Sequence, residues 1–207
     1  MTLDLPAPDA QETKSLAECI RSRRSIREYS ELPLPVSCLS ELLWSAQGIT
    51  GVNGERATPS AKALYPLHLH VLVRRVAELK PGIYNYRADN HSLQLLDELP
   101  ADGKIEEVGI GDQPWLKEAA MIIGVAANLA DITQRFEAQP PKGERGKRYV
   151  YMETGALAQN IHLCATAMEI GCVLVGGFDD LQAKKVLGFP AEIDPTALLC
   201  IGRRRRV

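Results

Sequence analysis

The sequence lacks the features that would place it in a membrane, in a secretory pathway or on nucleic acid. Its 207 residues contain no stretch of about 18 apolar residues, so no membrane span is expected. The first thirteen residues have neither a basic start nor an apolar run, which argues against a signal peptide. The formal net charge is only −2, which excludes a general attraction to nucleic acid. We therefore expect a cytoplasmic protein with no membrane or nucleic-acid partner.

Cysteine pairs and familiar catalytic motifs are also missing. The five cysteines are odd in number and form no CxxC pair, which favours a reduced setting. No GxGxxG, GxxxxGK[ST], GxSxG or HExxH occurs, so a dinucleotide fold, a P-loop, a serine hydrolase and a zinc protease are all unsupported. His68 and His70 share one face of a predicted strand without a further ligand at suitable spacing, so no metal site is expected. Cys164 lies in an apolar helical run, which favours a core thiol over a nucleophile.

What is present is the composition of one ordinary globular domain. Apolar residues make up 45% and charged residues 24%. No linker is long enough to divide the chain, and its length is sufficient to bury a core. We expect a flexible N-terminal arm over residues 1–14 and a single domain over residues 15–207. The mixture of helical and strand patterns predicts an α+β or three-layer fold.

Helical spacing and cap residues predict several helices. Ser15 with Glu18 three residues later has the form of a capping box. The segment Tyr149–Ile170 is apolar on nearly every face, which is typical of a buried helix and leaves open a second subunit as its cover. Gly171 is expected to end it as a C′ glycine. The predicted helices are Leu16–Ser22, Val36–Ala46, Ile105–Ile110, Leu129–Phe136, Tyr149–Ile170 and one from Asp179 or Asp180 to about residue 187.

Alternating and continuous apolar runs predict the strands. Leu67–Val73 alternates, and Ala119–Ala127 is apolar throughout, which indicates a buried strand. Gly82–Leu96 has the pattern of a hairpin with its turn at Ala88–His91. Two short strands are expected at Cys172–Val175 and Ala197–Ile201. The segments Ser25–Pro35, Gln47–Lys62 and Gln139–Lys147 are expected to be extended or loop.

Arginines at the two ends of the sequence are its most unusual feature. Four lie near the start, at Arg21, Arg23, Arg24 and Arg27, and four end the chain, at Arg203–Arg206. They form either two solvated surface patches or one shared anion site. An extended chain would send Arg23, Ser25 and Arg27 to one side. Two guanidinium groups and a hydroxyl on one side suit a large anionic ligand.

Two further segments could approach a flat ligand. In Arg56–Ala61 the small residues expose backbone, Pro59 stiffens the chain and Ser60 offers a hydrogen bond; an ordinary loop fits equally well. In Leu174–Phe178 a strand runs into Gly176 and Gly177, where the backbone can approach a ring or a phosphate. Paired glycines also occur in ordinary turns, so this segment alone does not identify a site.

Taken in order, these segments resemble the nitroreductase superfamily, and most closely its branch of SagB-type FMN-dependent oxidoreductases. The motifs that carry the resemblance are Arg23–Arg27, Pro59–Leu67, Gly82–Tyr86, Glu153–Ala156 with Gln159 and Asn160, and Val175–Asp180. The resemblance implies an α+β, three-layer fold with a central, mainly antiparallel sheet flanked by helices. It also implies an intertwined homodimer with two FMN molecules at the interface, each touched by both chains, and with the long helix at the centre of that interface.

The resemblance further implies roles for the arginines and glycines. Arg23 with Arg203 or Arg205 would hold the FMN phosphate, and the richness of the tail leaves open which arginine does so. Arg27 would face the pyrimidine edge of the flavin. Reduction places negative charge there, and a fixed cation stabilises it. The full set implied is Arg23, Arg24, Ser25, Arg27, Pro59, Ser60, Ala61, Leu64, Val175, Gly176, Gly177, Arg203 and Arg205, with Pro59, Ser60 and Ala61 reaching the flavin of the other subunit and Gly176 and Gly177 near its N5.

The resemblance implies an oxidoreductase that takes hydride from NAD(P)H through FMN to nitro, quinone or similar small acceptors. Hydride would move directly to and from flavin N5, which agrees with the absence of a catalytic triad or dyad. One alternative is a SagB-like dehydrogenase that oxidises azoline rings in peptides within a complex. Another is a flavin-binding protein with little reductase activity. An RNA- or partner-binding module has no aromatic stacking set to support it. Lys62 and Ala63 depart from many relatives, which puts side-chain contacts there in doubt.

Overall fold

One seven-stranded sheet runs through the protein. The computed structural model describes residues 2–8, 14–98 and 105–205. The strand order is β1-β4-β3-β2-β5-β7-β6, and every neighbouring pair is antiparallel. The hairpin expected over Gly82–Leu96 is confirmed as β3 and β4. The strands are β1 Thr2–Asp4, β2 His68–Val73, β3 Gly82–Arg87, β4 Ser92–Glu98, β5 Met121–Ala127, β6 Ile170–Val175 and β7 Asp194–Arg203.

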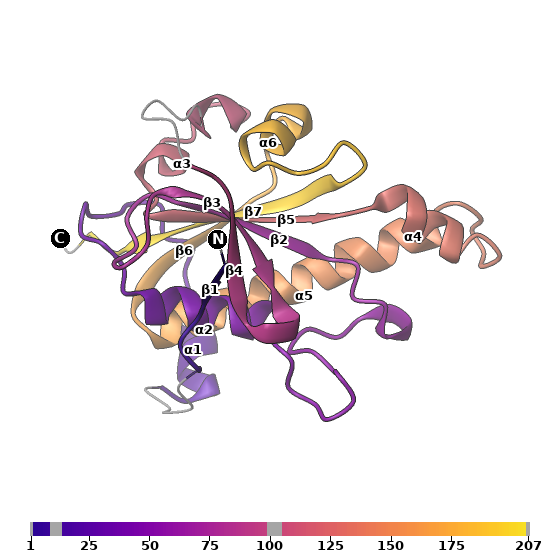
Figure 1. Ribbon diagram of the computed structural model, residues 1–207, viewed down its shortest axis with the longest axis horizontal. Coiled ribbons are helices and arrows are strands. Elements are labelled where there is room, and N and C mark those ends of the chain that lie inside the picture. Colours follow the sequence, from indigo (N-terminus) through magenta and orange to yellow (C-terminus); the bar gives the residue numbers. More distant parts are fainter. Residues whose placement is uncertain (1, 9–13, 99–104, 206–207) are drawn as a thin grey trace.

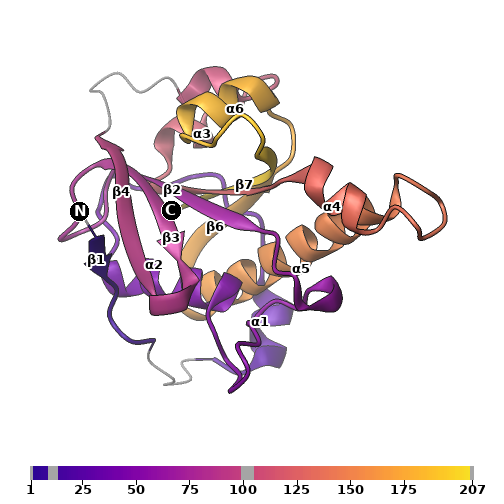
Figure 2. The ribbon, with the colours of Figure 1, turned by 45° about the vertical axis from the view of Figure 1, so that its right-hand side comes forward.

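Helices cover both faces of this sheet. In Figures 1 and 2, α1, α2 and α5 lie on one face, and α3 and α6 lie on the other, which confirms the predicted three-layer α+β architecture. Within the described ranges, no helix combines the length and the apolar character that a membrane crossing requires. The helices are α1 Leu16–Ser22, α2 Val36–Gln47, α3 Trp115–Glu118, α4 Leu129–Arg135, α5 Arg145–Ala167 and α6 Asp180–Val186, with 3₁₀ turns at Ala61–Ala63, Ala88–Asn90 and Ile105–Val108.

Strand β5 shows why the sheet needs cover on both sides. All seven of its residues are buried, because β2 and β7 flank it and a hydrophobic core covers each face of the sheet. Met121 and Ile123 point into the core beneath α2 and α5, whereas Ile122 and Ala126 point into the second core beneath α3 and α6. Successive strand residues face opposite sides, so a continuous apolar run is what a doubly covered strand requires.

Helix α5 begins and ends earlier than its periodicity predicts. It spans Arg145–Ala167 rather than residues 149–170. Glu169 follows it with a left-handed φ of 59°, and β6 begins at the next residue. The prediction that Gly171 is a C′ glycine is therefore wrong, since Gly171 lies inside a strand. A Cβ there would come within 2.9 Å of Ile26 and 3.0 Å of Tyr29, so its small size is needed for packing.

The expectation of a flexible arm over residues 1–14 is wrong for its first part. Thr2–Asp4 form β1, which pairs with β4 through Leu3 opposite Leu93. The next residue, Leu5, is buried, and its N–H donates to the His91 carbonyl at 3.0 Å. Three residues are too few to show an alternating pattern, so the sequence carries no strand signal here. Residues 9–13 lie outside the described residues.

Tyr29 fixes the segment after α1 to the ends of β6 and β7. Its ring is buried, and its hydroxyl lies 2.8 Å from the carbonyl oxygens of both Ile26 and Cys200. The ring packs directly on Gly202, where a Cβ would meet ring carbons at 2.8 Å. The Ile26 N–H donates to the Cys172 carbonyl at 2.9 Å. The segment is therefore held against two strands that occur more than 140 residues later in the chain.

We predict that Gly202→Ala destabilises the protein by about 1–3 kcal/mol, because the added methyl group forces the buried Tyr29 ring to move. Urea unfolding of the two proteins measures the difference. Gly176→Ala is the matched control: no atom lies within 4 Å of the position its Cβ would take. Its free energy of unfolding should stay within about 0.5 kcal/mol of wild type. Equal stability of wild type and Gly202→Ala would contradict the packing role of Gly202.

Candidate functional site

The segments that follow the early arginines and contain the late ones pair at one end of the sheet. The Ser30 N–H donates to the Arg203 carbonyl at 2.9 Å, and Tyr29 pairs with Arg204 in an isolated antiparallel bridge. The Arg205 N–H donates to the Glu28 carbonyl at 3.3 Å. The two arginine-bearing segments are therefore neighbours in the fold, and the shared anion site remains a prediction.

The early arginines have different partners. Arg23 is the C-cap of α1 and is half-buried. Arg24 is exposed and folds back, with its Nη1 donating to the carbonyl of Arg23 at 2.7 Å. Ser25 is exposed. The Arg27 guanidinium lies 5.3 Å from the centre of the Trp115 ring, within range of a cation–π contact. Arg27 is thereby directed toward α3.

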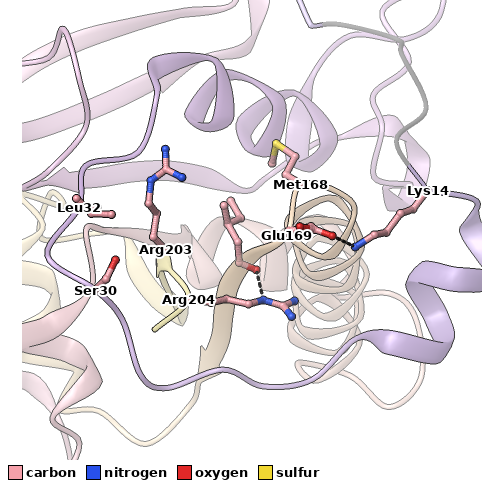
Figure 3. Close-up of a pocket in the computed structure, with 8 residues that line it drawn as sticks. Lys14, Ser30, Leu32, Met168, Glu169, Arg203 and Arg204 are labelled. Atoms are coloured by element: carbon pink, nitrogen blue, oxygen red, sulfur yellow. Dashed lines mark hydrogen bonds and ion pairs between the residues drawn. The ribbon is translucent and has the colours of Figure 1, made fainter. Parts of the chain in front are cut away.

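Two of the late arginines line a cavity of about 620 Å³ (Figure 3). The Arg203 Nε donates to the Pro33 carbonyl at 2.9 Å, and the Arg204 Nε donates to the Ile170 carbonyl at 3.3 Å. Each guanidinium is thus held through its Nε, which leaves the terminal nitrogens for other acceptors. Arg205 differs, because its Nη2 contacts the Tyr29 carbonyl at 3.3 Å and lies 4.0 Å from Glu118.

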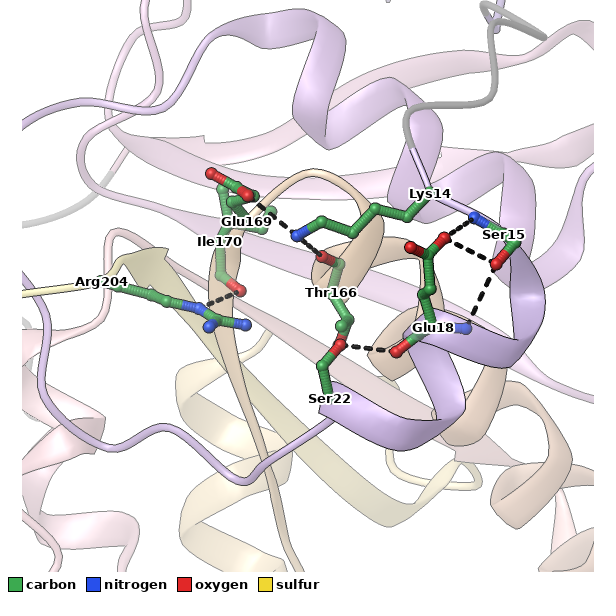
Figure 4. Close-up of polar contacts among 8 residues, drawn as sticks. All are labelled: Lys14, Ser15, Glu18, Ser22, Thr166, Glu169, Ile170 and Arg204. Atoms are coloured by element: carbon green, nitrogen blue, oxygen red, sulfur yellow. Dashed lines mark hydrogen bonds and ion pairs between the residues drawn. The ribbon is translucent and has the colours of Figure 1, made fainter.

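A lysine and a carboxylate form the far wall of the same cavity. Lys14 Nζ lies 2.9 Å from Glu169, which neutralises it (Figure 4). The predicted capping box that begins α1 is confirmed beside it, since Ser15 Oγ and the Glu18 carboxylate bond each other's backbone N–H groups. With Lys14 and Glu169 paired, the net charge of the cavity wall comes from Arg203 and Arg204.

His162 on α5 is a buried polar group without a partner. It is 5% exposed, and its Nδ1 has no hydrogen-bond partner among the described residues. Burial, with a smaller contribution from the nearby Arg23 cation, lowers the pKa of His162 to about 4. Buried polar atoms normally have a hydrogen-bond partner, so the Nδ1 of His162 lacks one that a bound group could supply.

The backbone after β6 is open. Val175 ends the strand and is buried, whereas Gly176 and Gly177 are exposed. A Cβ on Gly176 would meet no atom within 4 Å, and one on Gly177 would meet only the Gln113 side chain at 3.5 Å. Neither glycine has a positive φ. Since neither turn geometry nor packing within the chain requires glycine here, the open space is available to another group.

The segment Pro59–Ala61 is fixed on α5. Glu153 is buried and accepts from Ser60 Oγ at 3.1 Å and from the Ala61 N–H at 2.8 Å. Burial raises the pKa of Glu153, and these two hydrogen bonds act against that rise. Pro59 itself is exposed, and Leu64 is half-buried against the core. The loop therefore presents a stiff, outward-facing tip.

The structure does not bring this loop to the arginine cavity within one chain. Glu153 holds the loop, whereas Thr166, whose carbonyl faces Lys14, lies thirteen residues further along α5. At 1.5 Å per residue the two positions are about 20 Å apart along the helix. The sequence-based expectation that Pro59, Ser60 and Ala61 serve the other subunit remains a prediction.

The sequence assigned no role to several residues of this region, although Glu153 and Asn160 belong to the motifs that carry the family resemblance. Glu153, Asn160 and His162 are visible only as polar interruptions of an apolar helix; Asn160 Nδ2 donates to the carbonyl of Ser45 at 3.1 Å and so ties α5 to α2. Trp115 next to Arg27 leaves no sequence signal. Cys164 is as expected for a core thiol, because burial raises its pKa to about 12. Within the described parts of the chain, no group of three or more potential metal ligands occurs.

We predict a pH dependence of stability that arises from His162. Its pKa falls from 6.5 to about 4 on folding, so the unfolded state binds the proton more readily. The stabilising contribution is complete above pH 6.5 and is lost as the pH falls toward 4. Between neutral pH and about pH 4.5, His162→Gln should lose roughly 1–3 kcal/mol less stability than wild type.

Urea unfolding at a series of pH values measures this difference. The other three histidines are present in both proteins, so their contributions cancel in the comparison. The same pH slope in wild type and His162→Gln would show that His162 is not the titrating group.

The comparisons with known proteins agree on one family. The family model described as "Nitroreductase family" matches residues 20–203. A protein of Methanocaldococcus jannaschii, named as a nitroreductase, is 36% identical over 204 residues, which are 98% of each chain. A crystal structure from Ralstonia eutropha, also titled a nitroreductase, is 26% identical, has a TM-score of 0.80 and is matched over 100% of this chain and 90% of its own.

A third similarity concerns the fold alone. A chain in the Escherichia coli microcin synthetase McbBCD complex, solved with truncated pro-MccB17 bound, is 19% identical. Its TM-score is 0.71, and the match covers 99% of this chain and 78% of that one.

Proposed function

Because the chain belongs to the nitroreductase family, we propose that it is an FMN-dependent oxidoreductase that transfers hydride from NAD(P)H to nitro, quinone or similar small acceptors. The observation that carries the proposal is the pairing of Glu28–Ser30, the segment that directly follows Arg23–Arg27, with Arg203–Arg205 at the end of the sheet. Membership of the family supports an oxidoreductase. The arrangement of this chain's residues supports the flavin.

The residues present fit a phosphorylated flavin in two respects. A phosphate needs fixed cations and donors; Arg23 is near enough to lower the pKa of His162, whose Nδ1 has no partner among the described residues. Arg203 and Arg204 are already oriented through their Nε atoms, so the terminal nitrogens of either are preorganised for an anion. A flat ring needs open backbone, and the open space at Gly176 and Gly177 offers it.

When bound, FMN would supply a ring nitrogen, N5, that accepts hydride from the donor and returns it to the acceptor. The chain's own part is binding, orientation and charge. Arg27 is held near Trp115 and forms no ion pair within the described residues, so its positive charge is not neutralised locally. A guanidinium keeps its proton at any working pH, so Arg27 can stabilise negative charge on a reduced flavin.

We further propose that the working unit is a homodimer assembled on α5. Tyr151 and Met152 are 54% and 64% exposed on this helix. Gly155 lies one turn further on, is exposed and has no atom within 4 Å of the position a Cβ would take. Glycine inside a helix costs about 1 kcal/mol relative to alanine, and nothing within the chain requires it. A second helix packed closely on this face would require it.

One alternative function has a structural observation in its favour. The fold is shared with a chain of a microcin synthetase complex that was solved with a truncated precursor bound. This favours, as the second candidate, a SagB-like dehydrogenase that oxidises azoline rings in a peptide and works in a complex. A flavin-binding protein with little reductase activity is distinguished from both by its lack of turnover.

Anaerobic titration of the purified protein with NADH and with NADPH tests the main proposal. The protein should be yellow, either of these donors should bleach it, and a nitro or quinone acceptor should restore the colour. A colourless protein that FMN cannot reconstitute would overturn the flavin proposal. A yellow protein that neither donor reduces would overturn the simple reductase and leave the azoline dehydrogenase to be tested with a peptide substrate.

We predict different effects for two arginines of the early segment. Arg23→Gln should weaken FMN binding by about 10- to 100-fold, because a charge-assisted contact to the phosphate is lost. Arg27→Gln should chiefly make the flavin reduction potential more negative, because charge on the reduced ring is less stabilised. Fluorescence titration measures the affinity, and spectroelectrochemistry measures the potential. An unchanged potential in Arg27→Gln, or unchanged affinity in Arg23→Gln, would refute the corresponding role.

We predict that Gly155→Arg weakens the dimer, because the side chain occupies the space between the two helices. Light scattering after gel filtration should give about twice the 22.7 kDa chain mass for wild type and a lower mass for the variant. Gln182→Arg, at an exposed position of α6, is the matched control and should leave the dimer intact. A monomeric wild type, or a variant that dimerises as tightly as wild type, would contradict the α5 interface.

A further inference from the structure

A second cavity lies between the β3–β4 hairpin and the segment that precedes β2. Its volume is about 310 Å³, within the range of small-ligand sites. Arg56 and His68 line one side, and Asn85 and Asp89 from the hairpin line the other. None of the residues expected to bind FMN lines it. The cavity is therefore separate from the arginine site at the end of β6 and β7.

Arg56 is held rigidly in this cavity. Its side chain is 20% exposed, and its Nη1 donates to Gln47 Oε1 at 3.0 Å. Gln47 is itself 2% exposed, so the acceptor is fixed in the core. The guanidinium carbon lies 4.9 Å from the centre of the Tyr65 ring, and the Arg56 backbone N–H donates to Tyr65 Oη at 3.2 Å. Few rotamers are left to this side chain, so a ligand need not order it.

Most of the donors of Arg56 have no acceptor within the described chain. A guanidinium has five N–H groups, and Gln47 accepts from one of them. The nearest carboxylate oxygen, on Asp89, lies 3.8 Å from Nη2, and the Asp89 side chain is 73% exposed. An ion pair so long and so exposed contributes little. Arg56 is thus a largely buried cation whose charge is poorly compensated and whose side chain lines the cavity.

The charges around the cavity indicate the ligand class. Arg56 and Arg87 are positive and Asp89 is negative, which leaves one net positive charge for a monoanion. Leu67, Leu69 and the Tyr86 ring supply apolar wall beside it. We propose that this cavity binds a small organic monocarboxylate, with its carboxylate on the Arg56 guanidinium. A phosphate dianion fits less well, because its second charge would lie close to Asp89.

The site has a direct connection to the loop held on α5. Tyr65, which packs on Arg56, donates its backbone N–H to Ser60 Oγ at 2.8 Å, and Ser60 in turn bonds Glu153. A carboxylate on Arg56 would therefore lie next to Tyr65, which is hydrogen-bonded to the Pro59–Ala61 segment through Ser60. Binding itself does not depend on the proposed flavin activity, and it can be measured without any electron donor.

Binding of acetate and of benzoate to the purified full-length protein tests the proposal. Ligand-observed NMR or calorimetry at constant ionic strength, with chloride as the balancing anion, should show saturable binding at one site per chain. Arg56→Gln should weaken it by about 10- to 100-fold, because the charged donor is lost. Arg135→Gln removes an arginine that pairs with Asp131 on the surface, and it should leave the affinity unchanged. Inorganic phosphate should bind more weakly than either carboxylate.

A second variant keeps the test decisive if Arg56→Gln fails to fold. Asp89→Asn changes an exposed side chain and raises the net charge of the cavity, so it should tighten acetate binding several-fold. Absence of saturable binding to wild type would overturn the proposal. So would equal affinity in wild type, Arg56→Gln and Asp89→Asn, or an equal loss in Arg135→Gln. Because no step uses NAD(P)H or flavin colour, each of these outcomes is independent of the result of the anaerobic titration.

Discussion

The seating of the Tyr29 ring on Gly202 is the contact on which the rest of the candidate site depends. Two segments from opposite ends of the sequence meet there, and each carries arginines. Like charges do not associate by themselves, so a separate interaction has to hold them together. A buried aromatic ring on a bare strand backbone, with its hydroxyl between two carbonyl oxygens, provides it. The packing of the buried Tyr29 ring then offsets the electrostatic repulsion between the arginines, whose side chains lie nearer the surface.

Helix α5 connects the separate parts of the site. Its inner face packs on the sheet, its middle ties down the Pro59–Ala61 segment through Glu153, and its end carries His162 beside Arg23. The distance along the helix keeps these two regions apart within one chain. If two copies pack through the exposed face around Gly155, the loop of one can approach the arginine end of the other. The exposed Gly155 and the outward-facing loop are the features of this chain on which the proposed dimer rests.

Local patterns in the sequence were sufficient to predict most helices and strands, because the spacing of apolar residues follows which side chains are buried. Strand β5 was predicted from its continuous apolar run, and the start of α1 from the spacing of Ser15 and Glu18. The end of α5 could not be predicted, because Glu169 adopts the left-handed backbone conformation that was expected of Gly171. Gly171 is instead a glycine because a larger residue would collide with Ile26 and Tyr29. β1 was missed because three residues carry no periodicity. The contact of Arg27 with Trp115 and the electrostatic effect of Arg23 on His162 are tertiary, and nothing in the spacing of these residues encodes them.

The strand order has a consequence for how the protein reaches its folded state. Strand β7 is inserted between β5 and β6, although it follows both in the sequence. Until β7 is in place, β6 has no neighbouring strand within the described sheet, and Tyr29 has no Gly202 to rest on. Contacts between residues as distant in sequence as Tyr29 and Gly202 form slowly. The cavity lined by Arg203 and Arg204 and the open backbone at Gly176 and Gly177 should therefore form in the last step of folding. A partly folded chain would then have no complete binding site for a cofactor.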